Sequence, residues 1–451
     1  RPLRLYAWLE LAIGLYGLAI PFLFSLLPTI YQPLWRTAGL SFFTLSLVRF
    51  VLAGLVLAIP TVLMGATLPV LSRVVARRAE AVGRDVGMLY TVNTVGAVIG
   101  ASLAGLFLIP SIGMAGTTAV AAILNLVAGA VAYAMDRRQT LEPEVASDGA
   151  VEAPRSQVLT RPASIALFAA FGVSGIAALV YEVAWTRALS LVLGSSVYAF
   201  TIMLTTFLVG LALGAGLGAW LADRVRRPLL VLSIVEGAVG ISAFAGLFLI
   251  RELPYVFLVL HRQFEASPAA LLLGTRLLVA ALVMLVPTTL LGAVFPLAVR
   301  AAAGRVNAIG RTVGALYSVN TLGAIAGAFA SGFLLIPWLG VEGSLVAAIV
   351  LNFVAAAALA FTSVPASRAV RSAIAIAMIA AAVVAAPLRP RWDPAVMASG
   401  VYRYAPNIKA ATRAEFYDHY LNGGDGDTVF YRDGVSATVA VQQQFGHFVL
   451  K

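Results

Sequence analysis

The sequence predicts an all-α polytopic membrane protein, and three observations support this fold class. The 451 residues are 61% hydrophobic and 11% charged, whereas soluble chains are about 45–50% apolar and about 25% charged. The mean hydropathy is +0.94, and several apolar runs reach the roughly 20 residues that cross a bilayer. The net charge of +11 is nearly all arginine and is concentrated in short loops, which is typical of the positive-inside rule. A soluble enzyme and a disordered chain are excluded; the lipid bilayer is an expected partner and nucleic acid is not.

Apolar runs between helix-breaking residues predict eleven helices. They span 5–27, 46–72, 88–110 and 114–135, then 164–190, 197–221, 229–250, 270–299, 313–336 and 342–362, and finally 372–387. A polar, acidic and proline-containing stretch separates the first four helices from the rest and is typical of a linker. The predicted domains are a first membrane repeat at 1–138, the linker at 139–162, a second repeat at 163–363, an additional helix at 364–390, and the start of a truncated extramembrane domain at 391–451.

The two halves contain the same sequence pattern twice. Residues 83–113 match residues 310–340 at 18 of 31 positions. The second copy has six predicted helices and the first has four, so we expect two more helices before Arg1. An even number of helices per repeat gives both copies the same orientation, which is the arrangement of major-facilitator transporters. The predicted fold is therefore a pair of major-facilitator-like six-helix repeats, of which the first is truncated.

The distribution of arginine predicts the orientation in the membrane. The loops around 73–84, 224–227 and 300–311 are arginine-rich and by parity lie on one side, which we expect to be cytoplasmic. This favours an integral protein of a bacterial inner membrane. The run at 372–387 is short for a span. If it crosses, the tail is external, and if it lies at the surface, the tail is cytoplasmic; we favour crossing.

Three motifs together resemble one known family. They are the segment from Ser174 to Ser196 with its Tyr-Glu-x-x-Trp-x-Arg core at 181–187, the glycine ladder that ends at 222–224, and the pattern Gly-Arg-x-x-Gly-x-Leu-Tyr-x-x-Asn-Thr-x-Gly-Ala at 83–97 and 310–324. The chain resembles, over essentially its whole length, the membrane portion of fused major-facilitator/spermidine-synthase-like proteins.

That resemblance carries expectations for the tail. Residues 428–441 look like the first β-hairpin of an aminopropyltransferase-type domain, and a helix is expected near 409–421 with a glycine-rich turn at 423–426. A site for decarboxylated S-adenosylmethionine and an amine would lie beyond Lys451, so no cofactor is expected in this chain and it is expected to be inactive alone. Ala437 and Thr438 stand where soluble spermidine synthases tend to have Tyr-Gln.

Three functions fit these features. The resemblance implies a membrane region that anchors or serves a transferase acting on an amine or related small molecule. The alternative is a major-facilitator-type transporter of a cationic or amphipathic solute through the cavity between the halves. A structural subunit that binds the partners of a membrane complex is the third.

Two Tyr–Asn pairs occupy equivalent positions in the repeats. They are Tyr90 with Asn93, and Tyr317 with Asn320. The amides either line a central cavity or tie neighbouring helices together, because a buried amide needs hydrogen-bond partners. Their duplication favours the structural interpretation.

Ionisable groups inside predicted spans are further candidates. Glu10 and Glu236 are expected either to bind a cation or relay a proton, or to be snorkelled or paired close to the cytoplasmic loops; neither interpretation is favoured. Glu182 and Arg187 contact a cationic ligand, or pair with other helices while Trp185 anchors at the membrane interface.

The remaining features are the glycine repeats and the basic loops. Gly210, Gly214 and Gly218 recur every four residues, as do Gly96 with Gly100 and Gly323 with Gly327, and this spacing predicts close helix packing. The loop Asp223, Arg224, Arg226 and Arg227 resembles the major-facilitator signature, either as a gating salt bridge or as a topogenic basic loop. The three histidines have no metal-ligand spacing, so no metal site is expected.

Overall fold

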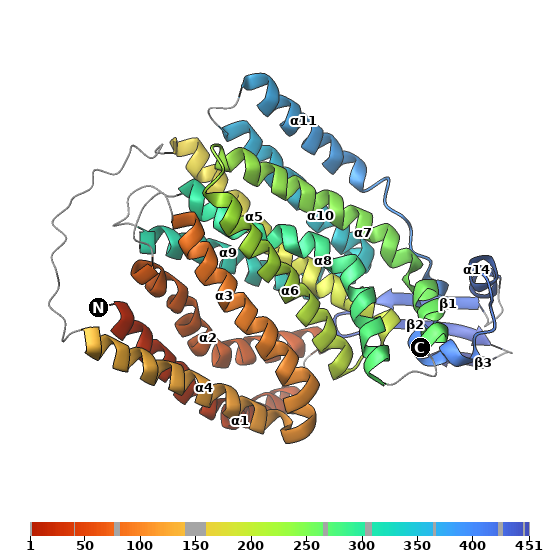
Figure 1. The fold of residues 1–451 in the computed structure, drawn as a ribbon. Coiled ribbons are helices and arrows are strands. Elements are labelled where there is room, and N and C mark those ends of the chain that lie inside the picture. The colour runs from red at the N-terminus through yellow and green to blue at the C-terminus, as the bar shows by residue number, and fades with distance from the viewer. Residues whose placement is uncertain are drawn as a thin grey trace. The chain divides into compact units, whose positions relative to one another are not determined.

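The computed structural model describes residues 2–39, 41–75, 82–139, 159–264, 269–302, 309–363, 367–422, 427–444 and 447–450. The chain is mostly helical, with one small sheet near its C-terminal end (Figure 1). Nearly all of the predicted linker and the predicted turn at 423–426 lie outside the described residues.

Eleven helices cover the predicted spans. They are α1 (Pro2–Ala38), α2 (Phe42–Val75), α3 (Val82–Leu103), α4 (Ile109–Gln139), α5 (Arg161–Leu193), α6 (Val197–Ala222), α7 (Pro228–Phe264), α8 (Ala269–Ala302), α9 (Ile309–Ala330), α10 (Ile336–Thr362) and α11 (Arg368–Ala385). In the described part of the chain, nine continuous helical segments are long and apolar enough to cross a membrane. The chain is therefore an integral membrane protein.

Two of these segments are much longer than one crossing. Residues 84–138 and 310–362 form helical segments of 55 and 53 residues, whereas about 20 residues cross a bilayer. Each contains a break at a glycine, at Gly113 (φ 70°, ψ 177°) and at Gly340 (φ 74°, ψ 176°). Glycine is needed there because other L-residues rarely adopt this conformation. Each segment is thus two helices joined at its glycine, where the sequence predicts a loop.

The duplicated sequence has the same local structure in both copies. In the first, α3 leads into the π-helical turn η1 (Ala104–Leu108), then α4 and Gly113. In the second, α9 leads into the π-helical turn η3 (Ser331–Leu335), then α10 and Gly340. The two matching segments therefore have the same order of local structure.

The chain divides into two compact units whose bounds differ from those of the repeats. Unit 1 comprises Arg1–Ala81, Leu103–Ser156 and Gly304–Tyr317, and unit 2 comprises Val82–Ser102, Gln157–Ala303 and Ser318–Lys451. In unit 1, α1 packs against α2 and α4. Gly14 and Gly129 make the α1–α4 approach close, because a Cβ on either would meet Leu126 or Leu11.

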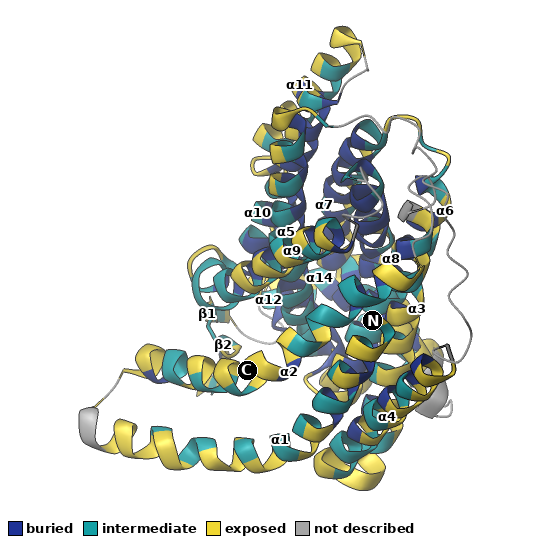
Figure 2. Ribbon diagram, turned by 90° about the vertical axis from the view of Figure 1, so that its left-hand side faces the viewer, coloured by how far each residue is buried: buried dark blue, intermediate teal, exposed yellow. Residues whose placement is uncertain are grey.

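Unit 2 has the larger buried core. Helix α10 packs against α5, α7 and α11, and α8 packs against α6 and α7. Figure 2 shows buried residues concentrated on α5, α7 and α10. The largest side chain that is fully buried belongs to Trp185.

Glycines allow the close contact between α6 and α8. A Cβ at Gly210, Gly214 or Gly218 would collide with Thr288, with the Thr289 carbonyl or with the Ala293 backbone. This arrangement agrees with the packing interpretation of the ladder. A Cβ at Gly323 or Gly327 would likewise collide with the backbone of Gly172 or Ile176, whereas at Gly96 and Gly100 it would meet no described atom within 4 Å.

The tail contains short helices and an antiparallel sheet. Its elements are α12 (Pro394–Met397), α13 (Val401–Tyr404), the 3₁₀ turn η4 (Ala405–Asn407), α14 (Arg413–Leu421), β1 (Asp427–Asp433), β2 (Thr438–Gln444) and β3 (His447–Leu450). The strand order is β1-β2-β3, and Asp433 pairs with Thr438 across the first turn. The predicted hairpin is confirmed, whereas the third strand was not predicted.

The tail and the loop at 223–227 lie at opposite ends of α7. The loop immediately precedes α7, and Arg262, near its other end, donates to the tail carbonyls of Ala410 and Ile408. Ser233, near the loop end of α7, donates to the Ala356 carbonyl of α10, and Trp392, just after α11, donates to the Leu247 carbonyl near the middle of α7. Helix α11 is long and apolar enough to be one of the candidate membrane spans.

Candidate functional site

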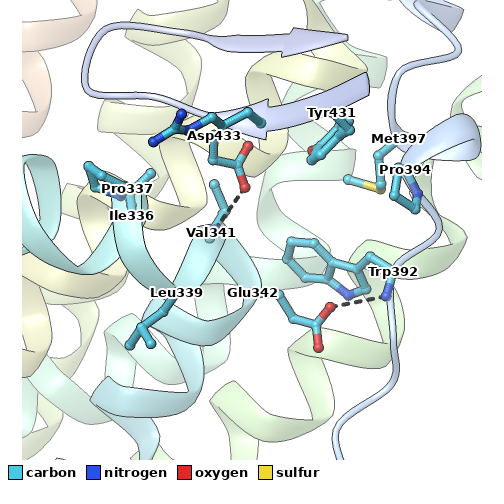
Figure 3. A pocket seen from close by; sticks show the side chains of 12 residues that line it. Ile336, Pro337, Leu339, Val341, Glu342, Trp392, Pro394, Met397, Tyr431 and Asp433 are labelled. Atoms are coloured by element: carbon cyan, nitrogen blue, oxygen red, sulfur yellow. Dashed lines mark hydrogen bonds between the residues drawn. The ribbon is translucent and has the colours of Figure 1, made fainter. Parts of the chain in front are cut away.

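A cavity of about 300 Å³ lies in unit 2, where β1 meets the start of α10 and the segment that follows α11 (Figure 3). It contains two carboxylates, Glu342 and Asp433, and two large aromatic rings, Trp392 and Tyr431. These four residues come from three segments that are far apart in the sequence.

The break at Gly340 positions the first carboxylate. Because the helix is interrupted there, the N–H of Val341 has no partner within the helix and donates to Asp433 Oδ2 at 3.0 Å. The other oxygen of Asp433 accepts from Thr438 Oγ1 at 2.7 Å. The glycine conformation and the hairpin turn thus hold one carboxylate on both oxygens.

The second carboxylate belongs to the residue after Val341. Glu342 accepts from the backbone N–H of Trp392 at 3.0 Å and pairs with Arg389 at 2.7 Å. The Trp392 indole donates in turn to the Leu247 carbonyl at 3.0 Å. These contacts fasten the segment after α11 to both α10 and α7.

The chemistry of the cavity follows from these partners. Burial, and then the neighbouring Asp433 carboxylate, raise the pKa of Tyr431 well above its ordinary value, so its hydroxyl remains a neutral donor. Both carboxylates already hold hydrogen bonds or an ion pair within the chain. The arrangement therefore serves first as a joint between the membrane helices and the tail.

Replacing Gly340 by alanine tests this joint. The positive φ at Gly340 is strained for an L-residue, by about 1–3 kcal/mol, and a Cβ there would lie 3.2 Å from Asp433 Oδ2. Gly113→Ala is the matched control, since φ is also positive and no described atom lies within 4 Å of its Cβ. We expect both variants to lower the thermal midpoint in detergent, and only Gly340→Ala to speed proteolysis of the tail. Equal proteolysis of the two variants would contradict the proposed joint.

A buried polar network lies deeper in unit 2. Tyr181 Oη donates to Asn352 Oδ1 at 2.7 Å, and Asn352 Nδ2 donates to Glu236 Oε2 at 2.7 Å. All three residues are at most 1% exposed, and they belong to α5, α10 and α7. Because none of the three side chains reaches water, each depends on the others for its hydrogen bonds. The network therefore links the three helices. Glu236 is thus paired rather than extended towards the basic loop.

Glu10 occupies the equivalent position in unit 1. It is buried, at 8% exposed, and hydrogen-bonds the Tyr6 side chain one turn earlier on α1. Asn125, the repeat equivalent of Asn352, is half-buried on α4. Both predicted acids are therefore buried, but only Glu236 is part of a network across three helices.

The Tyr-Glu-x-x-Trp-x-Arg segment lies on α5. Trp185 is fully buried and stacks on Tyr181 at 4.9 Å, so the prediction of a Trp anchor at the membrane interface is wrong. Arg187 donates to the Val435 carbonyl of the tail. The sequence instead predicts a partner on another membrane helix. Glu182 is half-buried and is not part of the network described above.

The two Tyr–Asn pairs have different surroundings. Asn320 donates to the Phe171 carbonyl of α5 at 3.1 Å, the kind of interhelical bond that the structural interpretation expects. Asn93 is exposed, and Tyr90 packs on Phe295 with ring centroids 4.7 Å apart. Tyr317 is half-buried near Gly65 in unit 1. The structure does not bring the two amides into one described cavity.

An ion pair joins the basic loop to the start of α3. Asp223 lies 3.6 Å from Arg84, and the Arg224 guanidinium lies 4.2 Å from the ring centroid of Trp220. Arg226 and Arg227 are exposed. A pair in which one partner, Arg84, is exposed contributes little stability, which favours the topogenic interpretation of the loop.

Sequence reasoning missed the partners of its own candidates. Glu236 and the motif containing Tyr181 were predicted as separate features, and Asn352 was not among the predicted site residues. The signal that was available is that a Glu and an Asn recur at equivalent positions in both copies, Glu10 with Asn125 and Glu236 with Asn352. No protein-family model, no curated protein and no solved structure matches this chain.

Proposed function

We propose that this chain is the membrane region of a spermidine-synthase-like fusion protein, in which a pair of major-facilitator-like repeats holds an extramembrane transferase-type domain. The observation that carries this proposal is the attachment of the tail, which is fixed to the ends of α5, α7 and α10 rather than tethered by a single segment. The sequence resemblance supports a transferase-type domain, and the attachment of the tail supports a bundle that holds this domain in place.

Polar contacts between α14 and α7 fix the orientation of the tail on the bundle. Arg413 forms a two-pronged pair with Glu252 at 2.6 and 2.8 Å. Tyr417 donates to Glu252 at 3.1 Å, and burial followed by the Glu252 charge raises the pKa of Tyr417 to about 12. The hydroxyl therefore stays a donor at any physiological pH. Planar bidentate pairs fix orientation as well as distance.

Apolar burial makes the attachment continuous with the bundle core. Val396, Met397, Val401 and Phe416 of the tail are buried in the same cluster as Trp185 and the other core residues of α5 and α7. Burying apolar side chains contributes about 1.5–3 kcal/mol each. A domain that begins in this way is held in one position over the end of the bundle.

The proposed location follows from the charge distribution. We place the arginine-rich loops in the cytoplasm and the protein in a bacterial inner membrane. The tail, at the opposite end of α7, is then external. The proposed substrate remains an amine or related small molecule, with decarboxylated S-adenosylmethionine as the cofactor of the complete protein.

Two assays separate this function from transport. Chain 1–451, reconstituted into liposomes, is expected to give no more uptake of labelled spermidine than empty liposomes, and calorimetry is expected to detect no binding of decarboxylated S-adenosylmethionine. The complete gene product is expected to transfer an aminopropyl group to an amine. Saturable uptake by chain 1–451 would instead establish the transporter alternative, and saturable nucleotide binding would place the cofactor site within this chain.

A further inference from the structure

A second cavity, of about 410 Å³, lies beside the β1–β2 turn in unit 2. It is bounded by the last turn of α5, by α13 with the residues just before it, and by the β1–β2 turn. The charged groups among its described lining residues are two guanidinium groups, Arg187 and Arg403, and none of these residues carries a carboxylate. Six hydroxyl-bearing residues complete its polar lining: Ser190, Ser195, Tyr402, Tyr404, Ser436 and Thr438.

The two arginines differ in how far their charge is already compensated. Arg187 donates to the Val435 carbonyl, and the Asp433 carboxylate lies near it. Arg403 is exposed, with its Cζ 5.9 Å from the ring centroid of Tyr404. Among the residues that the structure describes, no carboxylate lies within 4.0 Å of Arg403. The cavity therefore has a net positive charge that resides mainly on Arg403.

The hydroxyl groups that line this cavity include donors that suit a negatively charged ligand. Ser190 and Thr438 use their hydrogens on the Arg187 carbonyl and on Asp433. Ser195 and Ser436 are exposed at the cavity wall and supply donors on two of its sides. A guanidinium fork with nearby hydroxyl donors is the arrangement that proteins use for tetrahedral oxyanions.

We propose that this cavity binds the phosphate group of a small molecule, with Arg403 as the principal charged contact and Ser195 and Ser436 as additional donors. This ligand is opposite in charge to an amine, so the inference does not depend on the proposed transferase activity. Since the α5 span ends at Leu193, beside the cavity, the phosphate can come from a lipid headgroup or from a soluble phosphorylated compound.

The experiment uses purified chain 1–451 with two probes. Glycerol 3-phosphate is titrated by calorimetry in detergent, and phosphatidylglycerol retention is measured by native mass spectrometry against phosphatidylcholine. We expect saturable binding of at least one probe, weakened at least tenfold by Arg403→Gln and only partly by Arg403→Lys, which keeps the charge but loses the fork. Arg391→Gln is the matched control, because Arg391 is exposed, follows α11 at the same end of the unit, and lines neither cavity.

The outcomes identify the source or reject the site. Loss of glycerol 3-phosphate binding in Arg403→Gln identifies a soluble ligand, and loss of phosphatidylglycerol retention identifies a lipid. Ser436→Ala, at an exposed turn position, gives a second test if Arg403→Gln lowers the thermal midpoint. Absence of saturable binding by both probes overturns the proposal, as does equal weakening by Arg403→Gln and Arg391→Gln, which would indicate general surface charge.

Discussion

Replacing Asn352 by leucine is expected to lower the free energy of unfolding by about 2 kcal/mol or more. The substitution leaves Tyr181 Oη without its acceptor and Glu236 Oε2 without its donor, and both groups are fully enclosed. Each stranded buried group costs about 1–3 kcal/mol, whereas a single interhelical hydrogen bond in a membrane contributes about 0.6 kcal/mol on average. Equilibrium unfolding in mixed micelles measures the change.

Two further variants test whether the effect belongs to the network. Asn125→Leu changes the equivalent residue of the first repeat, which is half-buried, and should cost less. The double variant Asn352→Leu with Glu236→Leu should recover part of the loss, because it removes the carboxylate that the single variant strands. If Asn352→Leu costs no more than Asn125→Leu, the network does not hold the three helices together.

Gly214→Ala is the second substitution for which we expect a large effect. An added Cβ would collide with the Thr289 carbonyl and press on Gly292 of α8. These are backbone atoms of a packed helix, so no rotamer change can relieve the collision, and α6 must move away from α8. Overpacking of this kind costs about 1–3 kcal/mol and occasionally more. We expect the thermal midpoint in detergent to fall by several degrees.

A neighbouring glycine provides the control for this variant. Gly216 lies on the same helix, and a Cβ there would approach no described atom more closely than 3.6 Å, at Thr91. Gly216→Ala should therefore be neutral or slightly stabilising, since alanine has the better helix propensity. Equal destabilisation by both variants would show that the cost arises from α6 itself and not from its contact with α8.

The spans could be predicted from the sequence because each depends on local composition. A run of about 20 apolar residues forms a helix in a bilayer whatever its neighbours are. The same holds for the hairpin, whose turn after Asp433 follows from the flanking β-rich runs. The predicted bounds of α1 and α7 are shorter than those observed, because Pro28 and Pro254, which follow the predicted ends, lie inside these helices.

The partners of the candidate residues could not be predicted in the same way. Tyr181 and Asn352 are separated by 171 positions, and no local pattern specifies which faces of two distant helices meet. Trp185 illustrates the difficulty, since a Trp near the end of a span is typical of the membrane interface. Here it is buried against Tyr181 because α10 and α7 cover that face of α5.

The sequence by itself determined the membrane class, the positions of the spans and the duplication, because hydrophobic runs and glycine breaks act within a single segment. Only the tertiary structure decided that Glu236 is paired with Asn352, that Gly340 exposes an N–H to Asp433, and that Arg403 lines a cavity whose described lining residues carry no carboxylate. Each of these depends on which atoms of distant segments come within hydrogen-bonding or van der Waals reach, and that is settled by the packing of the whole unit.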